Sequence, residues 1–123
     1  MEKRVYPFQI SKQLDEKLAR WAGFEYIPNA ESQQLDFWIC PTGGRGLASY
    51  PPPFTVSLDA CFRWLIPLID AWEMAPIFSE DEIEVWVEKW TRQTVHHGKA
   101  TDKEAALALC KAIEQLIDAE NAE

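Results

Sequence analysis

Two adjacent histidines, His96 and His97, are the side chains of this sequence best suited to proton transfer near neutral pH. Neighbouring residues of a strand point to opposite faces of a sheet, so we do not expect the pair to grip one metal ion. No ligand spacing such as H-E-x-x-H surrounds them. The sequence therefore favours a surface strand end, with a general base or a ligand contact as the alternative role of either histidine.

A glycine-rich segment lies in the long predicted loop between Pro41 and Thr55 and offers free backbone N–H groups beside a guanidinium. Such an arrangement can cradle a phosphate or another small anion. The segment lacks the Gly-Lys-Ser/Thr ending of a P-loop, and no helix is predicted directly after it. A flexible loop is the first interpretation and an anion contact the second. The candidate ligand-binding residues are Gly43, Gly44, Arg45, His96 and His97.

No arrangement of nucleophile, base and acid is visible elsewhere in the chain. Carboxylates are frequent between Asp70 and Glu88, where there is no Lys or Arg, but no base accompanies them. Ser57 is better placed as a helix cap than as a nucleophile, and no nucleophile-elbow pattern occurs. We therefore expect no catalytic residue, no metal and no cofactor. The acidic stretch predicts either a solvated face or a surface offered to a basic partner.

Length and composition set the class of protein. The 123 residues suit one domain with one core, residues 1–123, and an apolar fraction of 47% is too high for disorder. No apolar run approaches the roughly 20 residues that span a bilayer, and no signal peptide is expected. A net charge of −8 repels nucleic acid and anionic lipid, so neither is an expected partner. Scattered cysteines, with Cys61 and Cys110 on predicted buried stripes, indicate a cytoplasmic location.

The first half of the chain predicts one helix and one hairpin. Residues 12–22 form a helix that Ser11 is placed to cap and that Gly23 ends in a left-handed conformation. Residues 24–27 and 35–40 show the alternation of short strands. Because only a turn separates them, we expect these two strands to pair.

Two further helices are predicted, one in mid-chain and one at the end. The middle helix begins at Ser57, and Pro67 predicts a kink or a break because it cannot donate to the carbonyl of Arg63. In the last helix, Thr101 and Glu104 have the spacing of a capping box. The predicted buried stripe of this helix comprises Ala106, Leu109, Cys110, Ile113, Leu116 and Ile117.

The segment 79–98 fits two structures. A capping-box pattern that starts at Ser79 favours a helix, whereas the alternation of β-branched residues with Glu and Trp favours a strand. We expect the strand, followed by a returning strand over residues 94–97 that Gly98 closes. The order of elements is then α-β-β-α-β-β-α, which predicts a small α/β (α+β) domain.

Trp86 and Trp90 are the aromatic residues hardest to place in a core. If the segment is a strand, Trp86 faces away from Ile83, and something has to cover its ring. A partner copy, a layer of the same chain and a stacked ligand are the alternatives. We take Trp86 and Trp90 as candidate interface residues of a homo-oligomer.

Short patterns around the three predicted helices point to a family. They comprise Trp21, Ala22, Gly23 and Phe24 near the first, Ser57, Asp59, Ala60 and Trp64 in the second, and Ala100, Thr101, Ala105, Leu109, Cys110 and Ala112 at the third. With the order of elements, they resemble the phage ABA sandwich domain family. The resemblance implies a layered helix–sheet–helix domain with a mostly antiparallel sheet, encoded by phages or prophages, without catalytic residues to transfer. Two features depart from the family pattern: Pro67 interrupts the middle helix, and residues 70–81 look like an insertion or a distorted strand.

We accordingly expect a non-enzymatic accessory protein of phage or prophage type that binds a host protein or a small anionic ligand. The phage association suggests that it acts in the bacterial cytoplasm against a host defence. One alternative is a small hydrolase or nucleotide-processing enzyme that uses His96 or His97 with Arg45. Another is a structural or assembly component of the virion.

Overall fold

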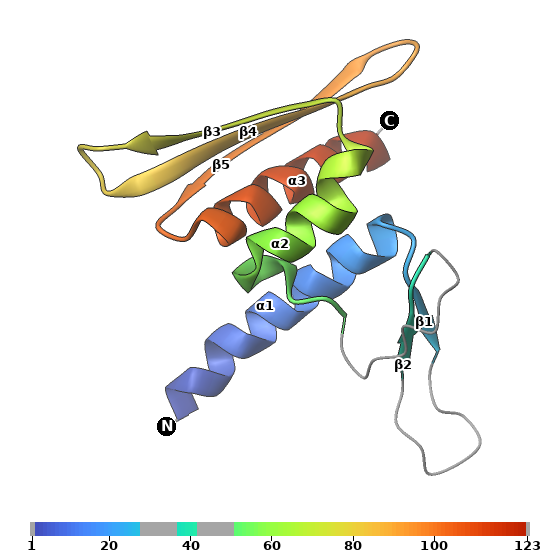
Figure 1. Cartoon of the computed structure of the whole chain (residues 1–123), viewed down its shortest axis with the longest axis vertical. Helices are drawn as coiled ribbons and strands as arrows, with labels where there is room; N and C mark the ends of the chain where they lie inside the picture. Colours follow the sequence, from blue (N-terminus) through green and yellow to red (C-terminus); the bar gives the residue numbers. More distant parts are fainter. Residues whose placement is uncertain (1, 28–36, 42–50, 123) are drawn as a thin grey trace. The chain divides into compact units, whose positions relative to one another are not determined.

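The computed structural model of the chain describes residues 2–27, 37–41 and 51–122, with the side chains of the first helix described from Lys12 (Figure 1). The chain has two compact units, Met1–Pro53 and Phe54–Glu123. Its elements are three helical regions and two antiparallel sheets, which confirms the predicted α+β class. The expectation of one domain over residues 1–123 stays a prediction.

In the first unit, helix α1 runs from Glu2 to Trp21. Gly23 follows it with φ of 98°. Its N–H donates to the carbonyl of Arg20 at 3.1 Å, and the N–H of Phe24 donates to the carbonyl of Ala19 at 2.9 Å. These two bonds make a Schellman motif, so the predicted end is confirmed. The predicted start is wrong, because the helix continues through the expected cap, Ser11, to Glu2.

Strands β1 (Glu25–Ile27) and β2 (Phe37–Ile39) pair antiparallel, as predicted, with Tyr26 opposite Trp38. The ring centroids of Tyr26 and Trp38 are 5.0 Å apart. The guanidinium of Arg20 lies 5.9 Å from the Tyr26 ring and 5.4 Å from the Trp38 ring. This cation–π contact ties the last turn of α1 to the hairpin.

The second unit begins with four short helical segments: η1 (Phe54–Val56), α2 (Leu58–Ala60), η2 (Cys61–Leu65) and η3 (Ile66–Leu68). Ser57 caps α2 as predicted, because its Oγ accepts the N–H of Ala60 at 3.1 Å. The predicted effect of Pro67 is also confirmed. The helical path changes from a π-helix to a 3₁₀-helix at Ile66 and ends at Leu68, since proline has no N–H to continue it.

Three strands follow in the order β3-β4-β5: β3 (Ala71–Ile77), β4 (Glu82–Trp90) and β5 (Val95–Asp102), each antiparallel to its neighbour. The strand interpretation of residues 79–98 is therefore confirmed. Gly98 does not close the last strand, however, because β5 continues four residues beyond it. Strand β3 lies within residues 70–81, which we expected to be an insertion or a distorted strand and left out of the predicted order, so the order is α-β-β-α-β-β-β-α. It carries Pro76, which an edge strand tolerates because it has only one neighbour.

Helix α3 (Ala105–Asn121) packs on β4 and β5, and its predicted stripe is buried. The predicted capping box is wrong, because Thr101 belongs to β5 and Glu104 is the N-cap. At the junction between β5 and α3, the hydrogen bonds are made by Asp102 instead. Its Oδ1 accepts the N–H of Glu104 at 3.1 Å, and its Oδ2 accepts a hydrogen bond from Lys111 Nζ at 2.7 Å. Burial on its own would raise the pKa of Asp102, but these hydrogen bonds and the charge of Lys111 outweigh it and lower that pKa.

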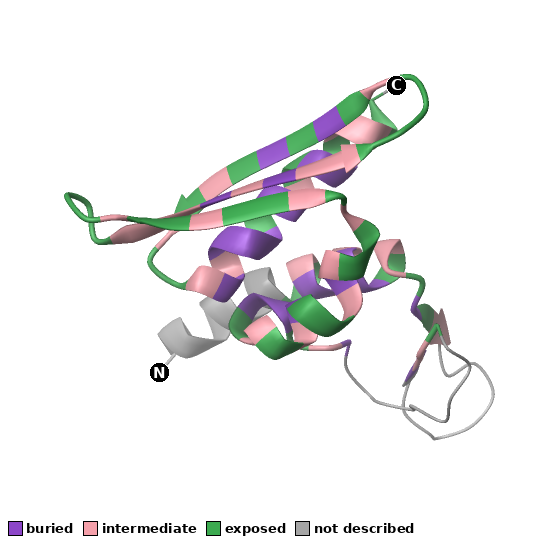
Figure 2. Cartoon of the chain, turned by 45° about the horizontal axis from the view of Figure 1, so that its top comes forward, coloured by how far each residue is buried: buried purple, intermediate pink, exposed green. Residues whose placement is uncertain are grey.

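The core of the second unit depends on a close approach of β5 to α3. A Cβ added to Gly98 would lie 1.8 Å from the backbone oxygen of Ala112, so the strand and the helix backbone are in direct contact there. Buried and exposed residues alternate along β5 (Figure 2). In the same unit, Cys61 and Cys110 are fully buried as predicted, with their Sγ atoms 3.7 Å apart. Cys61 Sγ lies 3.2 Å from the Phe54 carbonyl, to which it donates a weak hydrogen bond.

We expect Gly98→Ala to destabilise the second unit by at least about 3 kcal/mol. The obstructing atom belongs to the backbone of Ala112 and cannot rotate away. Urea unfolding measures the effect. Ala100→Gly, on the same face of β5, is the control and should cost no more than about 1 kcal/mol. Equal losses in the two variants would contradict the close approach.

Asp102→Asn should cost about 1 kcal/mol at pH 7 and much less at low pH. The folded pKa lies below the ordinary value of 3.8, so the contribution of the charged carboxylate is present above pH 3.8 and is lost as the pH falls through the folded pKa. Urea unfolding of both proteins at neutral and acidic pH checks this. A pH-independent difference would mean that the Asp102 charge does not stabilise the fold.

Candidate binding face

The sheet of the second unit has one face packed on helices and one bare face. Figure 1 shows α2 and α3 on the same side of β3-β4-β5, and no other described element of this unit lies on the opposite side. We call that opposite side the outer face. The strand register assigns to it Ala71, Glu73, Ala75 and Ile77 of β3, Glu82, Glu84, Trp86, Glu88 and Trp90 of β4, and Val95, His97, Lys99 and Thr101 of β5.

Trp86 is the centre of the outer face. In the register it lies opposite Glu73 of β3 on one side and Lys99 of β5 on the other. Glu84 and Glu88 precede and follow it on the same face of β4, two residues away in each direction. The Trp86 side chain is half-buried. An indole is thus set among three carboxylates, with part of its surface open.

Two of these carboxylates are already paired. Glu84 Oε2 lies 3.2 Å from Lys99 Nζ, and Glu88 Oε2 lies 3.3 Å from His97 Nδ1. The second oxygen of Glu88 accepts the Trp90 indole N–H at 2.8 Å. Within the described residues, Glu73 has no such ion pair. The outer face therefore keeps an excess of negative charge.

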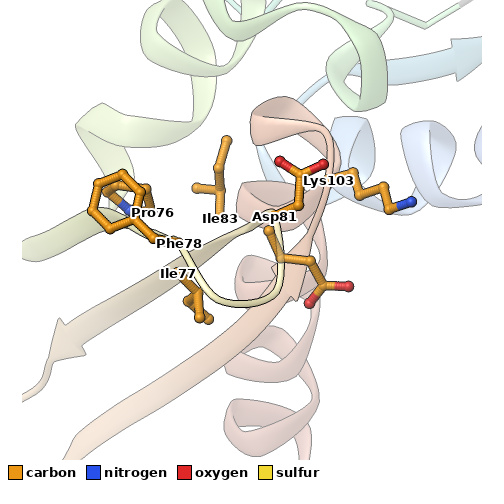
Figure 3. Close-up of a pocket in the computed structure, with 7 residues that line it drawn as sticks. Pro76, Ile77, Phe78, Asp81, Ile83 and Lys103 are labelled. Carbon is orange, nitrogen blue, oxygen red and sulfur yellow. The ribbon is translucent and has the colours of Figure 1, made fainter.

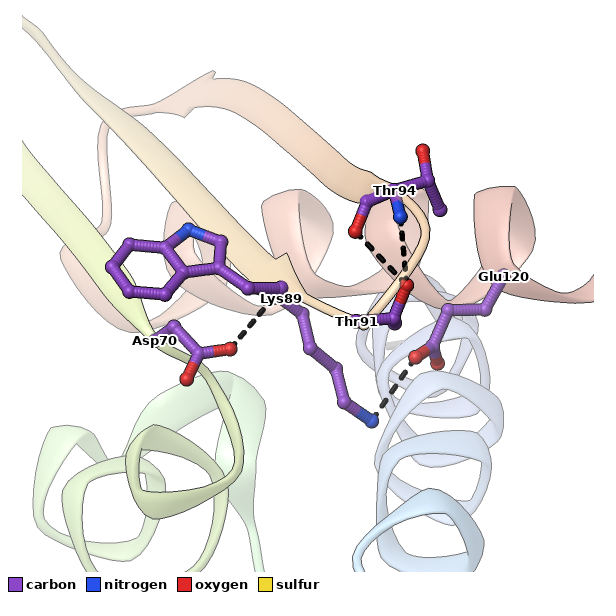
Figure 4. Close-up of polar contacts among 6 residues, drawn as sticks. Asp70, Lys89, Thr91, Thr94 and Glu120 are labelled. Carbon is purple, nitrogen blue, oxygen red and sulfur yellow. Dashed lines mark hydrogen bonds and ion pairs between the residues drawn. The ribbon is translucent and has the colours of Figure 1, made fainter.

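One end of the outer face is apolar and lies beside the β4–β5 turn. Hydrogen bonds at this turn fix its conformation (Figure 4). The backbone N–H of Trp90 donates to Asp70 Oδ2 at 2.6 Å, and Thr91 and Thr94 close the turn with hydrogen bonds between them. The side chains of Trp90 and Val95, which lie opposite each other, are 56% and 41% exposed. Aromatic surface left open beside a fixed turn is typical of a contact site.

A small pocket of about 220 Å³ lies at the other end, at the β3–β4 turn. Figure 3 shows Pro76 and Phe78 on one side of the turn and Lys103 on the other. Asp81 has φ of 54°, a conformation that aspartate tolerates better than most residues. The Phe78 side chain is 89% exposed. Phe78 lies in the turn beyond β3, and the register places Pro76 and Ile83, which also line the pocket, on the helix-packed face, so this exposed ring is not part of the outer face.

The histidines point to opposite faces, as their adjacency predicted. The expected surface position is wrong for His96, which is buried on the helix-packed face of β5 because that face packs on α3, whereas His97 is exposed on the outer face. They therefore do not form one site. Trp86 and Trp90 share the outer face, but the expectation that a partner copy covers them stays a prediction. Gly43, Gly44 and Arg45 lie outside the described residues.

Sequence reasoning missed Glu73, Glu84 and Lys99 as members of one surface. Glu84 was visible in the alternation of acids with Ile83 and Val85, which already placed it on the face opposite the core. Glu73 was not placed, because residues 70–81 were left open between an insertion and a distorted strand and no partner strand was assigned to them. Lys99 was not visible, because β5 was expected to end before it.

Among residues 2–27, 37–41 and 51–122, no group of three or more His, Cys, Asp or Glu side chains is arranged to hold a metal ion. No helix in this part of the chain has both the length and the apolar character needed to cross a bilayer.

Comparisons with known proteins return no match: no family model, no curated protein and no solved structure is significantly similar to this chain. The resemblance to the phage ABA sandwich domain family therefore stays a prediction from the sequence patterns.

Glu88→Ala should free the indole N–H of Trp90, because Glu88 Oε1 is its acceptor. We expect its proton resonance to move upfield, while the free energy of unfolding changes by no more than about 0.5 kcal/mol. Nitrogen–proton correlation NMR and urea unfolding make the two measurements. Glu84→Ala, which removes the other paired carboxylate of the outer face, should leave that resonance in place. A shift of equal size in both variants would rule out the specific contact.

Proposed function

We propose that this protein is a non-enzymatic binding protein whose working surface is the outer face of the β3-β4-β5 sheet. The observation that carries the proposal is a half-buried Trp86 set among acidic side chains on a sheet face that no described element of its unit covers. Aromatic residues near the centre of a surface supply much of the energy of protein–protein contacts. A protein surface is the kind of partner that matches so flat a site.

The geometry of the histidines limits the alternative of a small hydrolase to a mechanism that uses one of them. His96 is buried on the helix-packed face, and His97 points to the other side of the sheet. General acid–base catalysis needs groups that reach the same reacting atoms. The two histidines do not meet that requirement together.

The wider setting of this function rests on the sequence patterns. Our first proposal is a phage or prophage accessory protein that acts in the bacterial cytoplasm, holds a host protein and blunts a host defence. A virion assembly component is the second, and the genes beside the coding sequence distinguish them. The small anionic ligand is less well supported, because the excess charge of the outer face is negative.

A photo-crosslinking residue placed at Thr101 should give one discrete covalent adduct in cells that contain the natural partner. Thr101 is exposed on the outer face and takes no part in the ion pairs around Trp86. The same residue placed at Lys111, exposed on α3, is the control, and it should give little or none of that adduct. Adduct patterns that do not differ between the two positions would refute the proposed surface.

A further inference from the structure

We propose that the outer face binds a basic protein segment, with an arginine side chain of that segment stacked on Trp86 and paired with Glu73. This inference rests on the proposed function and deepens it, because it names the chemistry of the partner. It commits to one occupant, an extended chain that carries guanidinium groups.

The first step of the argument is charge. The outer face carries four carboxylates, Glu73, Glu82, Glu84 and Glu88, and only one ammonium group, that of Lys99. Since Lys99 and His97 already pair with Glu84 and Glu88, the carboxylates of Glu73 and Glu82 have no ion pair among the described residues. A partner that supplies positive charge complements this face, whereas nucleic acid and anionic lipid do not.

The second step excludes a second copy of this chain as the occupant. A symmetric dimer through the outer face would place each patch against its own equivalent. The excess carboxylates of one copy would then face those of the other, and like charges brought together at an interface cost several kcal/mol. The face is therefore better suited to a different, basic partner than to itself.

The third step is the indole. Trp86 lies directly opposite Glu73 in the register, so a flat cation over the ring also reaches that carboxylate. Arginine fits this geometry better than lysine, because its planar guanidinium stacks on a ring and pairs with a carboxylate at once. The same chain already contains such a contact, where the Arg63 guanidinium lies 5.1 Å from the Trp64 ring.

The fourth step is the character of one end of the face. Trp90 and Val95 leave apolar surface exposed there, beyond the charged centre. A segment that continues from Trp86 toward this end therefore needs apolar side chains beside its arginine. Such a segment gains both cation pairing and apolar burial.

The test uses a short capped peptide in which arginine alternates with valine and threonine, titrated into the full chain and followed by nitrogen–proton correlation NMR. We expect shifts confined to the outer-face residues and weaker binding as the ionic strength rises. Trp86→Leu should raise the Kd about threefold to thirtyfold, the range expected for a lost cation–π contact. Glu73→Gln should raise it about twofold to fivefold.

Matched controls make the outcome specific. The same peptide with citrulline in place of arginine keeps the shape but not the charge, and it should bind at least about tenfold more weakly. Asp118→Asn on α3 changes the net charge as Glu73→Gln does, and it should leave the Kd unchanged.

Three results would overturn the inference. The first is equal binding of the arginine and citrulline peptides. The second is a spread of the shifts over the whole chain, which would indicate general attraction to its net charge of −8. The third is broadening of the outer-face signals with protein concentration alone, which would indicate a second copy. If the peptide fails while crosslinking at Thr101 still gives a discrete adduct, the basic partner is refuted and the binding face is retained.

Discussion

The direct contact between Gly98 and the backbone of Ala112 is the constraint on which the second unit depends. Only a residue without a Cβ lets β5 come so close to α3, and that closeness brings Val85 and Val87 of the neighbouring strand into the same core. Since α3 covers this face of β4 and β5, all alternate residues of these strands are turned outward. Which residues the outer face exposes is therefore set by which residues the helix-packed face buries against α3.

Sequence reasoning was successful where local signals were strong. The Gly23 stop, the Ser57 cap, the break at Pro67 and the buried stripe of α3 each depend on a few neighbouring residues, and each is found. It failed where tertiary pairing decided the structure. Pro76 and the lack of alternation left residues 70–81 open between an insertion and a distorted strand. A capping pattern at Thr101 favoured a helix start where the last residues of β5 lie, because the pairing of β5 with β4 outweighs that pattern.

The candidate site was predictable only in part, for the same reason. Alternation along residues 82–90 placed Trp86 opposite the core, and adjacency separated His96 from His97. Nothing local indicated that Glu73 lies beside Trp86, because that neighbour comes from a strand found only through its pairing with β4. Surface groups of this kind are assembled by register, which depends on three strands at once and not on any one segment.

The two edges of the sheet have a further consequence. Pro76 leaves β3 without one N–H, and at the other edge Gln115 Oε1 accepts the Lys99 N–H at 3.0 Å. An incoming strand would lack one backbone N–H donor at the β3 edge, and at the β5 edge it would meet an N–H that is already hydrogen-bonded to Gln115. Lateral growth of this sheet into ribbons or fibrils is thus discouraged at both margins.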